Sequence, residues 1–128
     1  MGTATRQDSA LRLDSLDSLQ WVGIGAAFVT AAIHLLLGIR LVPSGLGVSF
    51  VLAGLGFLGA IVLVMVDYRR RAVYAVGIPF TAIQIVLWYY VNFAAGSKSF
   101  PTDIGALGAA DKLAQVVLLA VLVVLLRR

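Results

Sequence analysis

Four polar side chains stand inside long apolar stretches of the chain, and they are the residues that could do chemistry: His34, Gln84, Asp111 and Gln115. A carboxylate beside an imidazole can exchange protons near neutral pH, and ionisable groups inside membrane helices mark ion and solute paths. The same groups can instead hold neighbouring helices together through hydrogen bonds. Their types therefore leave two interpretations open, a proton- or solute-binding site and a structural cluster.

The depths of these groups in their apolar stretches are closely matched. At ~1.5 Å per residue, His34 and Asp111 each lie ~10 Å below the same predicted outer edge. Gln84 and Gln115 lie ~13 and ~16 Å deep on the same scale. Ser49 lies at a shallower depth from that edge, and the opposite half of each stretch is almost purely apolar. We therefore predict one polar intramembrane cluster, confined to the outer half.

The direction of each side chain sets which groups can meet. Helical side chains lean toward the helix N-terminus, so Lys112 can extend outward to water and Asp111 leans the same way. His34 leans toward the membrane centre, where it can meet Gln84 or Gln115 in place of Asp111. The geometry therefore permits an Asp–His pair without requiring it. A metal or haem at His34 needs further ligands, and the chain has one histidine and no cysteine, so we predict no metal and no cofactor.

The composition is that of a membrane protein. Hydrophobic residues make up 61% of the 128 residues, charged residues make up 12%, and the mean hydropathy is +1.00. A soluble domain of this size could not bury so much apolar surface, since charged residues usually reach ~25%. The net charge of +4 fits membrane topology better than nucleic-acid binding. The sequence has no P-loop, HExxH or GxSxG motif, and we predict no catalytic residue.

Four apolar segments are long enough to cross the ~30 Å hydrocarbon core of a bilayer. They cover residues 21–41, 45–66, 72–93 and 104–126. Residues 1–20 form a polar N-terminal segment, in which 8–20 has the pattern of a short amphipathic helix on the membrane surface. For the first seven residues, disorder is an equally good interpretation. We predict an all-α integral membrane protein, a four-helix up-and-down bundle with short loops.

Lys and Arg are distributed unevenly between the two ends of this bundle. Seven fall on the side of the termini, in the N-terminal segment, the 67–71 loop and the C-terminus, and three fall on the other side. Positive residues concentrate in cytoplasmic loops, so we predict that both termini are cytoplasmic. The predicted localisation is the cell membrane, as a multi-pass protein.

Small residues form a stripe on the second apolar segment, where they recur three or four positions apart: Gly45, Ser49, Ala53, Gly56 and Ala60. Membrane helices associate without a hydrophobic driving force, and small residues let their backbones approach closely. The alternative is that glycine is simply common in membrane helices. We favour a helix-packing stripe that is buried against another helix.

The chain resembles uncharacterised small four-helix membrane proteins of halophilic archaea over about residues 21–126. The resemblance is carried by TAAIHLLLGI, VLAGLGFLGA, DYRRR followed by IPFTAIQIVLWYY, and GALGAADKLAQVVLLAVLVVLL. It implies a four-span bundle and supplies no activity, cofactor or catalytic residue. The layout is also similar to DoxX-like four-span proteins and, in size, to small multidrug transporters. The latter rely on a glutamate in their first span, whereas this chain has no Glu and carries His34 there.

The function that these patterns favour is a structural or accessory subunit of a membrane assembly, in which the polar cluster fixes the register of the helices. The alternative is a small-solute or proton-coupled transporter that uses the outer cluster. A redox or lipid-linked enzyme subunit is a third, weaker hypothesis. The expected partners are the lipid bilayer and either a second copy or another membrane protein, without nucleic acid.

Overall fold

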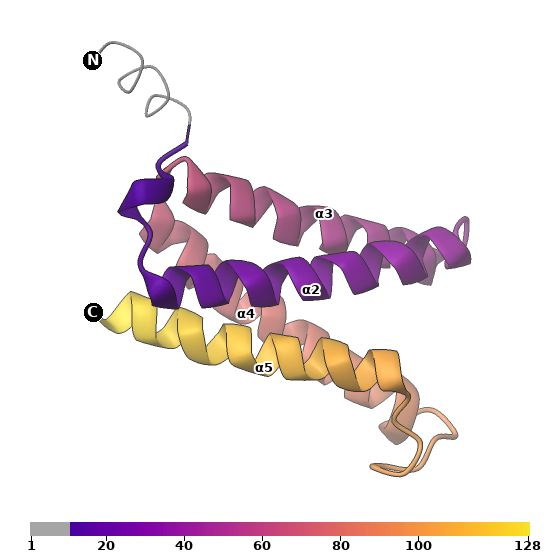
Figure 1. Ribbon diagram of the computed structural model, residues 1–128. Coiled ribbons are helices and arrows are strands. Elements are labelled where there is room, and N and C mark those ends of the chain that lie inside the picture. Colours follow the sequence, from indigo (N-terminus) through magenta and orange to yellow (C-terminus); the bar gives the residue numbers. More distant parts are fainter. Residues whose placement is uncertain (1–10) are drawn as a thin grey trace, which may run out of the picture.

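The computed structural model describes residues 11–128, in which all regular structure is helical (Figure 1). The elements are, in order, η1 (Leu13–Ser15), α2 (Ser18–Leu41), α3 (Gly45–Met65), α4 (Arg70–Tyr89), η2 (Tyr90–Ala94) and α5 (Ala106–Arg127). η1 is a short 3₁₀ turn, and η2 is a π-helical continuation of α4. Four helices, with α4 and η2 taken as one, are long and apolar enough to cross a membrane. The all-α four-helix prediction is confirmed, whereas membrane insertion and the orientation of the termini stay predictions.

The start of α2 lies before the predicted residue 21 because a capping box forms there. The Asp17 carboxylate accepts the Gln20 backbone N–H at 3.0 Å, and the Gln20 side chain accepts the Asp17 backbone N–H at 3.0 Å. This reciprocal pair satisfies donors that a helix start otherwise leaves free. The surface helix expected over 8–20 does not run through residues 11–17, which hold only η1 before α2 begins. Residues 8–10 of that expectation lie outside the described part of the chain.

The four long helices run up and down and form two pairs (Figure 1). α2 packs along α3 and α5, and α4 packs along α5, while α3 and α4 touch only sparsely. The close approach of α2 and α3 requires glycine, since a Cβ at Gly54 would lie 2.7 Å from Leu35 Cγ. α2 begins and α5 ends at one end of the bundle, where Arg128 Nη1 donates to Asp17 Oδ2 at 2.5 Å. We call the half at this end the inner half and the opposite half the outer half, following the predicted orientation.

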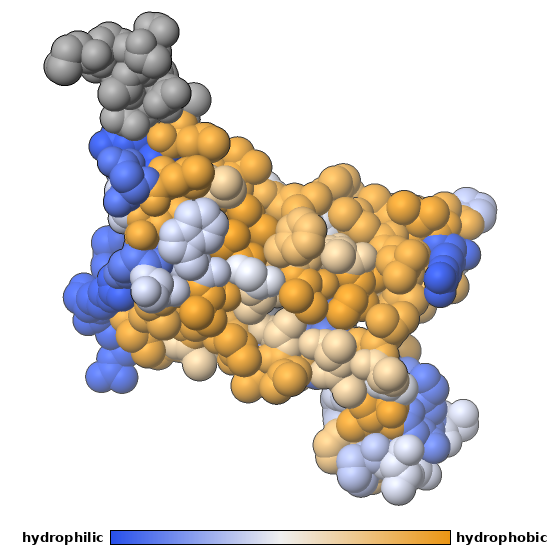
Figure 2. Space-filling model, in the orientation of Figure 1, coloured by the Kyte–Doolittle hydropathy of each residue, from blue (hydrophilic) through white to orange (hydrophobic). Residues whose placement is uncertain are grey.

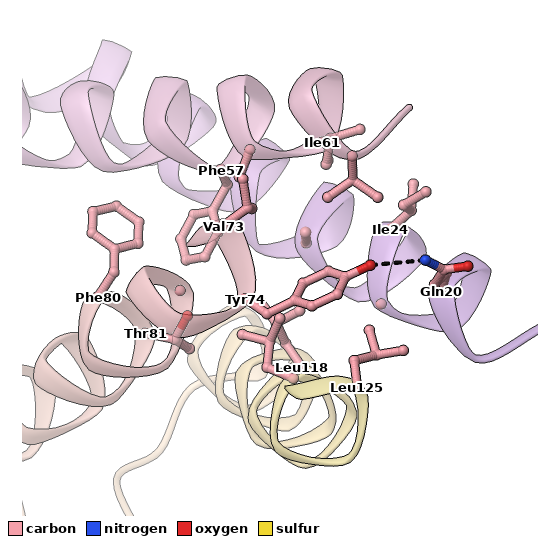
Figure 3. Close-up of a pocket in the computed structure, with 16 residues that line it drawn as sticks. Gln20, Ile24, Phe57, Ile61, Val73, Tyr74, Phe80, Thr81, Leu118 and Leu125 are labelled. Atoms are coloured by element: carbon pink, nitrogen blue, oxygen red, sulfur yellow. Dashed lines mark hydrogen bonds between the residues drawn. The ribbon is translucent and has the colours of Figure 1, made fainter. Parts of the chain in front are cut away.

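The inner half holds the apolar core. Its buried side chains include Ala27, Phe57, Ile61, Tyr74, Leu118 and Leu125, which come from all four helices. They surround a small cavity of about 60 Å³ with almost entirely apolar walls (Figure 3). The hydrogen bond drawn in Figure 3 joins Gln20 Nε2 to the Tyr74 hydroxyl at 2.8 Å. This half of the bundle is therefore closed by packed hydrocarbon.

Candidate functional site

The polar cluster lies where α2 packs against α5. The residues that meet there are all buried: Thr30 and His34, one turn apart on α2, and Asp111 and Gln115, one turn apart on α5. The Thr30 hydroxyl donates to Asp111 Oδ1, and Gln115 Nε2 donates to Thr30 Oγ1 at 3.2 Å. Gln115 Nε2 also donates to Gln84 Oε1 at 3.0 Å, which joins α4 to the cluster. The structure thus brings together all four polar residues selected from the sequence.

His34 has a defined hydrogen-bonding direction. Its Nδ1 lies 2.8 Å from the Thr30 backbone carbonyl oxygen, which can only accept, so Nδ1 carries a hydrogen. The same nitrogen lies 3.5 Å from Asp111 Oδ1, an electrostatic contact at the limit of a hydrogen bond. The ring packs against Phe50 and Phe57, with centroid separations of 5.3 and 6.0 Å. The other ring nitrogen, Nε2, has no protein partner within residues 11–128.

Lys112 completes the cluster instead of extending outward as the sequence suggests. Its ammonium group donates to Asp111 Oδ2 at 2.6 Å and to Gln115 Oε1 at 2.8 Å. It also lies 5.4 Å from the centre of the Trp88 ring. A buried carboxylate is costly without a counter-charge, and charge-assisted hydrogen bonds are the strong ones. The attraction to Asp111 therefore outweighs the tendency of the lysine to reach water, and the pair is neutral overall.

Thr30 and Trp88 take part in the site although neither was selected from the sequence. Thr30 does carry a signal, because it stands one turn before His34 on the same helix face. Trp88 carries none, since a tryptophan near the end of an apolar segment is typical of the membrane interface. Polar residues one turn apart on an apolar helix are therefore the pattern that could have extended the predicted cluster.

A cavity of about 510 Å³ lies above the cluster, between the two helix pairs. The residues of its polar floor are His34, Gln84, Asp111 and Lys112. Its walls are mostly apolar side chains from all four helices, and Lys98 and Asp103 of the loop before α5 also line it. Figure 2 shows a notch between the outer end of α2 and α3 and the loop before α5. The volume is that of a pocket for a small molecule.

The small-residue stripe predicted on α3 does not form one continuous helix contact. Ser49 and Ala53 line the outer cavity, Ala60 lines the inner cavity, and a Cβ at Gly45 would meet nothing within 4 Å. A Cβ at Gly56 would lie 2.9 Å from Cζ of Phe80. α3 approaches α2 through other glycines, Gly47 and Gly54. The stripe therefore faces α4 and the two cavities, while the tightest contact of α3 lies on another face.

The site can hold hydrogen-bonded ligand atoms or water. Within residues 11–128, Gln84 Nε2 is buried without a hydrogen-bond partner, as is Thr81 Oγ1 one turn away on α4, which lines the inner cavity. Buried polar groups normally have a partner, either in the protein or in ordered water. Among the residues that the structure describes, no three His, Cys, Asp or Glu side chains gather in a way that could hold a metal ion. The chemistry available here is hydrogen bonding, charge pairing and proton exchange.

The fold and the site define a class of protein, a small four-helix protein with helices of membrane-spanning length and a polar cluster buried among them. Residues 5–126 match the family described as Family of unknown function (DUF7475), and the chain belongs to this family. No curated protein and no solved structure matches the chain. The family assigns no activity, so the function is argued from the site.

Proposed function

We propose that this protein is a multi-pass protein of the cell membrane that takes a small solute from the outer side into the cavity of its outer half. The proposal is carried by the charged floor of that cavity, where Asp111, Lys112 and His34 meet beneath a space of about 510 Å³. The cavity lies away from the Arg-rich termini, which the positive-inside rule assigns to the cytoplasm. Its opening therefore faces outward.

The free-energy cost of placing charged groups in a membrane supports a functional site at this cavity. An Asp or Lys at the membrane centre costs ~2.5–3.5 kcal/mol on insertion scales, and such residues usually face a partner or water. Here the carboxylate, the ammonium group and the imidazole all line the same cavity. Within residues 11–128 His34 Nε2 has no partner, and Nδ1 of the same ring lies 3.5 Å from Asp111 Oδ1, so a bound solute can exchange a proton with the imidazole of the cluster. The function that this arrangement supports best is that of a proton-coupled solute carrier.

A structural or accessory subunit of a membrane assembly is the second candidate function. The observation in its favour is that the hydrogen bonds of Thr30, Gln115 and Gln84 join α2, α5 and α4 and so fix their register. In this role the lipid bilayer and a second copy or another membrane protein are the partners. The origin in halophilic archaea and the DoxX-like relationship suggested by the resemblance stay predictions.

Thiol labelling tests the proposed carrier, because the chain has no cysteine of its own. Gly108→Cys places a thiol at the cavity, where a Cβ meets only Trp88 Nε1 at 3.7 Å. Ser97→Cys in the exposed loop reports the outer surface, and Leu118→Cys on the same helix as Gly108 reports the closed core. A membrane-impermeant thiol reagent added to intact cells should label positions 97 and 108 and leave position 118 unlabelled.

Two results contradict the carrier. Labelling of Ser97→Cys without labelling of Gly108→Cys means that water does not reach the cavity. Protection of Ser97→Cys in intact cells, with labelling after the cells are opened, means that the loop lies on the cytoplasmic side. The structural candidate survives the first result, because a cluster that only fixes helix register needs no contact with water.

A further inference from the structure

We infer that the solute of this cavity is an amphiphilic weak acid, a carboxylic acid with an apolar body of medium length. The inference rests on the proposed function, since it names the solute class for the same cavity. It is carried by the hydrogen-bonding capacity that the cavity floor leaves unfilled and by the apolar walls above that floor.

Within residues 11–128, two hydrogen-bond donors at or beside the floor have no partner. The Lys112 ammonium group has three N–H bonds, of which Asp111 Oδ2 and Gln115 Oε1 take two. Gln84 Nε2 is buried and has no partner within the described residues, although Gln84 Oε1 accepts from Gln115. Lys112 and Gln84 both line the cavity. The floor therefore offers the charged donor of Lys112 to an acceptor oxygen of the solute, while the Gln84 amide lies buried beside it.

One acceptor of the floor is free. His34 Nδ1 donates to the Thr30 carbonyl at 2.8 Å, and Nε2 has no partner within residues 11–128. In the Nδ1–H tautomer, Nε2 presents a free lone pair. Asp111 is already engaged, because its Oδ1 accepts from Thr30 and its Oδ2 accepts from Lys112. A solute that fills the remaining hydrogen-bonding capacity of the floor must donate one hydrogen bond to His34 Nε2.

A carboxylic acid matches this set of donors and acceptors. Its O–H donates to His34 Nε2, while its carbonyl oxygen accepts from Lys112. The charges of Asp111 and Lys112 cancel, so a neutral acid adds no net charge to a site of low dielectric constant. An ester lacks the hydrogen that Nε2 requires, and a quaternary ammonium group supplies neither donor nor acceptor.

The walls of the cavity match the remainder of such an acid. They include Leu37, Leu46, Phe50, Leu87, Val91 and Leu107. Apolar walls with a few convergent polar groups are typical of small-molecule pockets, in which the apolar part binds by burial and the polar groups fix the orientation. An alkyl chain therefore lies along the walls with its carboxyl group on the floor.

This binding consumes one proton. In water near neutral pH the free solute is a carboxylate, whereas in the complex a proton lies between its oxygen and Nε2. The charged and titratable groups lining the cavity are His34 on α2, Asp111 and Lys112 on α5, and Lys98 and Asp103 in the loop, with none from α3 or α4. Affinity for the acid therefore falls as the pH rises, because the bound form carries the proton.

Tryptophan quenching provides the experiment. The chain has two tryptophans, of which Trp88 lines the cavity and Trp21 lies near the start of α2, in the inner half. The full-length Trp21→Phe variant in phosphatidylcholine nanodiscs is titrated with 2-bromodecanoic acid, whose bromine lies next to the carboxyl group and quenches nearby indoles. The matched Trp88→Phe variant reports partition of the same probe into lipid at the far end.

The expected result is saturable quenching of Trp88 that decanoic acid relieves and methyl decanoate does not, with only unsaturable quenching of Trp21. Gly108→Leu, which fills the cavity, should abolish the saturable part, and His34→Leu should weaken it by about tenfold. Equal, unsaturable quenching of both tryptophans, or equal competition by the methyl ester, overturns the inference. If Gly108→Cys is labelled by the thiol reagent but the protein does not bind the acid, the proposed carrier function is retained and only this solute class is excluded.

Discussion

The two halves of this bundle hold the same helices together in different ways. In the inner half α5 packs through hydrocarbon, with Leu118 and Leu125 each 5% exposed. In the outer half α5 meets α2 through the Thr30, Asp111 and Gln115 hydrogen bonds, and a cavity opens above them. Apolar packing gives no hydrophobic gain in lipid, so shape fixes the inner contact and polar pairing fixes the outer one. The difference teaches that the cluster marks the depth at which packed hydrocarbon gives way to a roomy cavity with a polar floor.

The cavities differ in the same sense. The inner cavity of about 60 Å³ has apolar walls and contains no charged side chain among its lining residues. The outer cavity of about 510 Å³ ends on a carboxylate, an ammonium group and an imidazole. An apolar void of small size stays empty, whereas a roomy polar one takes up water or a ligand. The outer half is therefore the half in which we expect exchange with the surroundings.

The largest effect is expected from replacing the carboxylate of the outer half. Asp111→Leu leaves the Lys112 ammonium group and the Thr30 hydroxyl without their partner, and it should lower the free energy of unfolding by about 3 kcal/mol. Asp111→Asn keeps a hydrogen-bonding side chain of the same shape and should cost less than half as much. Denaturant titration of the purified protein in detergent micelles measures both. Equal stability of the Leu and Asn variants would remove the distinction between the two halves.

A smaller loss is expected from the inner half, where volume alone decides. Leu118 is 5% exposed and Leu113, on the same helix, is 67% exposed. Leu118→Ala leaves a void in packed hydrocarbon and should cost about 2 kcal/mol, whereas Leu113→Ala, the matched control, should cost almost nothing. The same denaturant titration applies. A cost at Leu113 as large as that at Leu118 would mean that α5 is rotated relative to this structure.

The smallest effect is expected at the inner surface. The Arg128 guanidinium beside Asp17, together with the Gln20 N–H, holds the pKa of the Asp17 carboxyl below its usual value. A lowered folded-state pKa means that the stabilisation is complete above the unfolded-state pKa and is lost as the pH falls through the folded one. Asp17→Ala should therefore lower Tm slightly at neutral pH and leave it unchanged in strong acid. Thermal scans at both pH values check this, and an equal loss at both would assign the effect to something other than the carboxylate.

The sequence predicts position along each helix well. Helix lengths follow from the apolar runs, and residue counting placed His34 and Asp111 at the same depth, where the structure brings their side chains within 3.5 Å of each other. Counting works because the rise per residue of a helix is constant.

Rotation about each helix axis could not be predicted in the same way. Outward-facing and core-facing side chains of these helices are both apolar, so Phe28 at 59% exposed and Phe57 at 3% exposed look alike in the sequence. For this reason the sequence does not predict that α3 packs against α2 through the face that holds Gly54. The sequence does not predict the ion pair between Lys112 and Asp111. That pair depends on how deeply the carboxylate is buried, and only the packing of α2 on α5 decides this.

The hydrogen bonds of the single histidine report most directly on the polar cluster. Nitrogen-15 NMR of the histidine-labelled protein reports His34 alone and distinguishes a hydrogen on Nδ1 from one on Nε2. We predict the Nδ1–H tautomer, because Nδ1 faces the Thr30 carbonyl at 2.8 Å. We also predict resonances that move in Asp111→Asn and stay in place in the inner-half control Leu118→Ala. An Nε2–H tautomer, with resonances that do not shift in Asp111→Asn, would contradict the claim that His34 and Asp111 belong to one cluster.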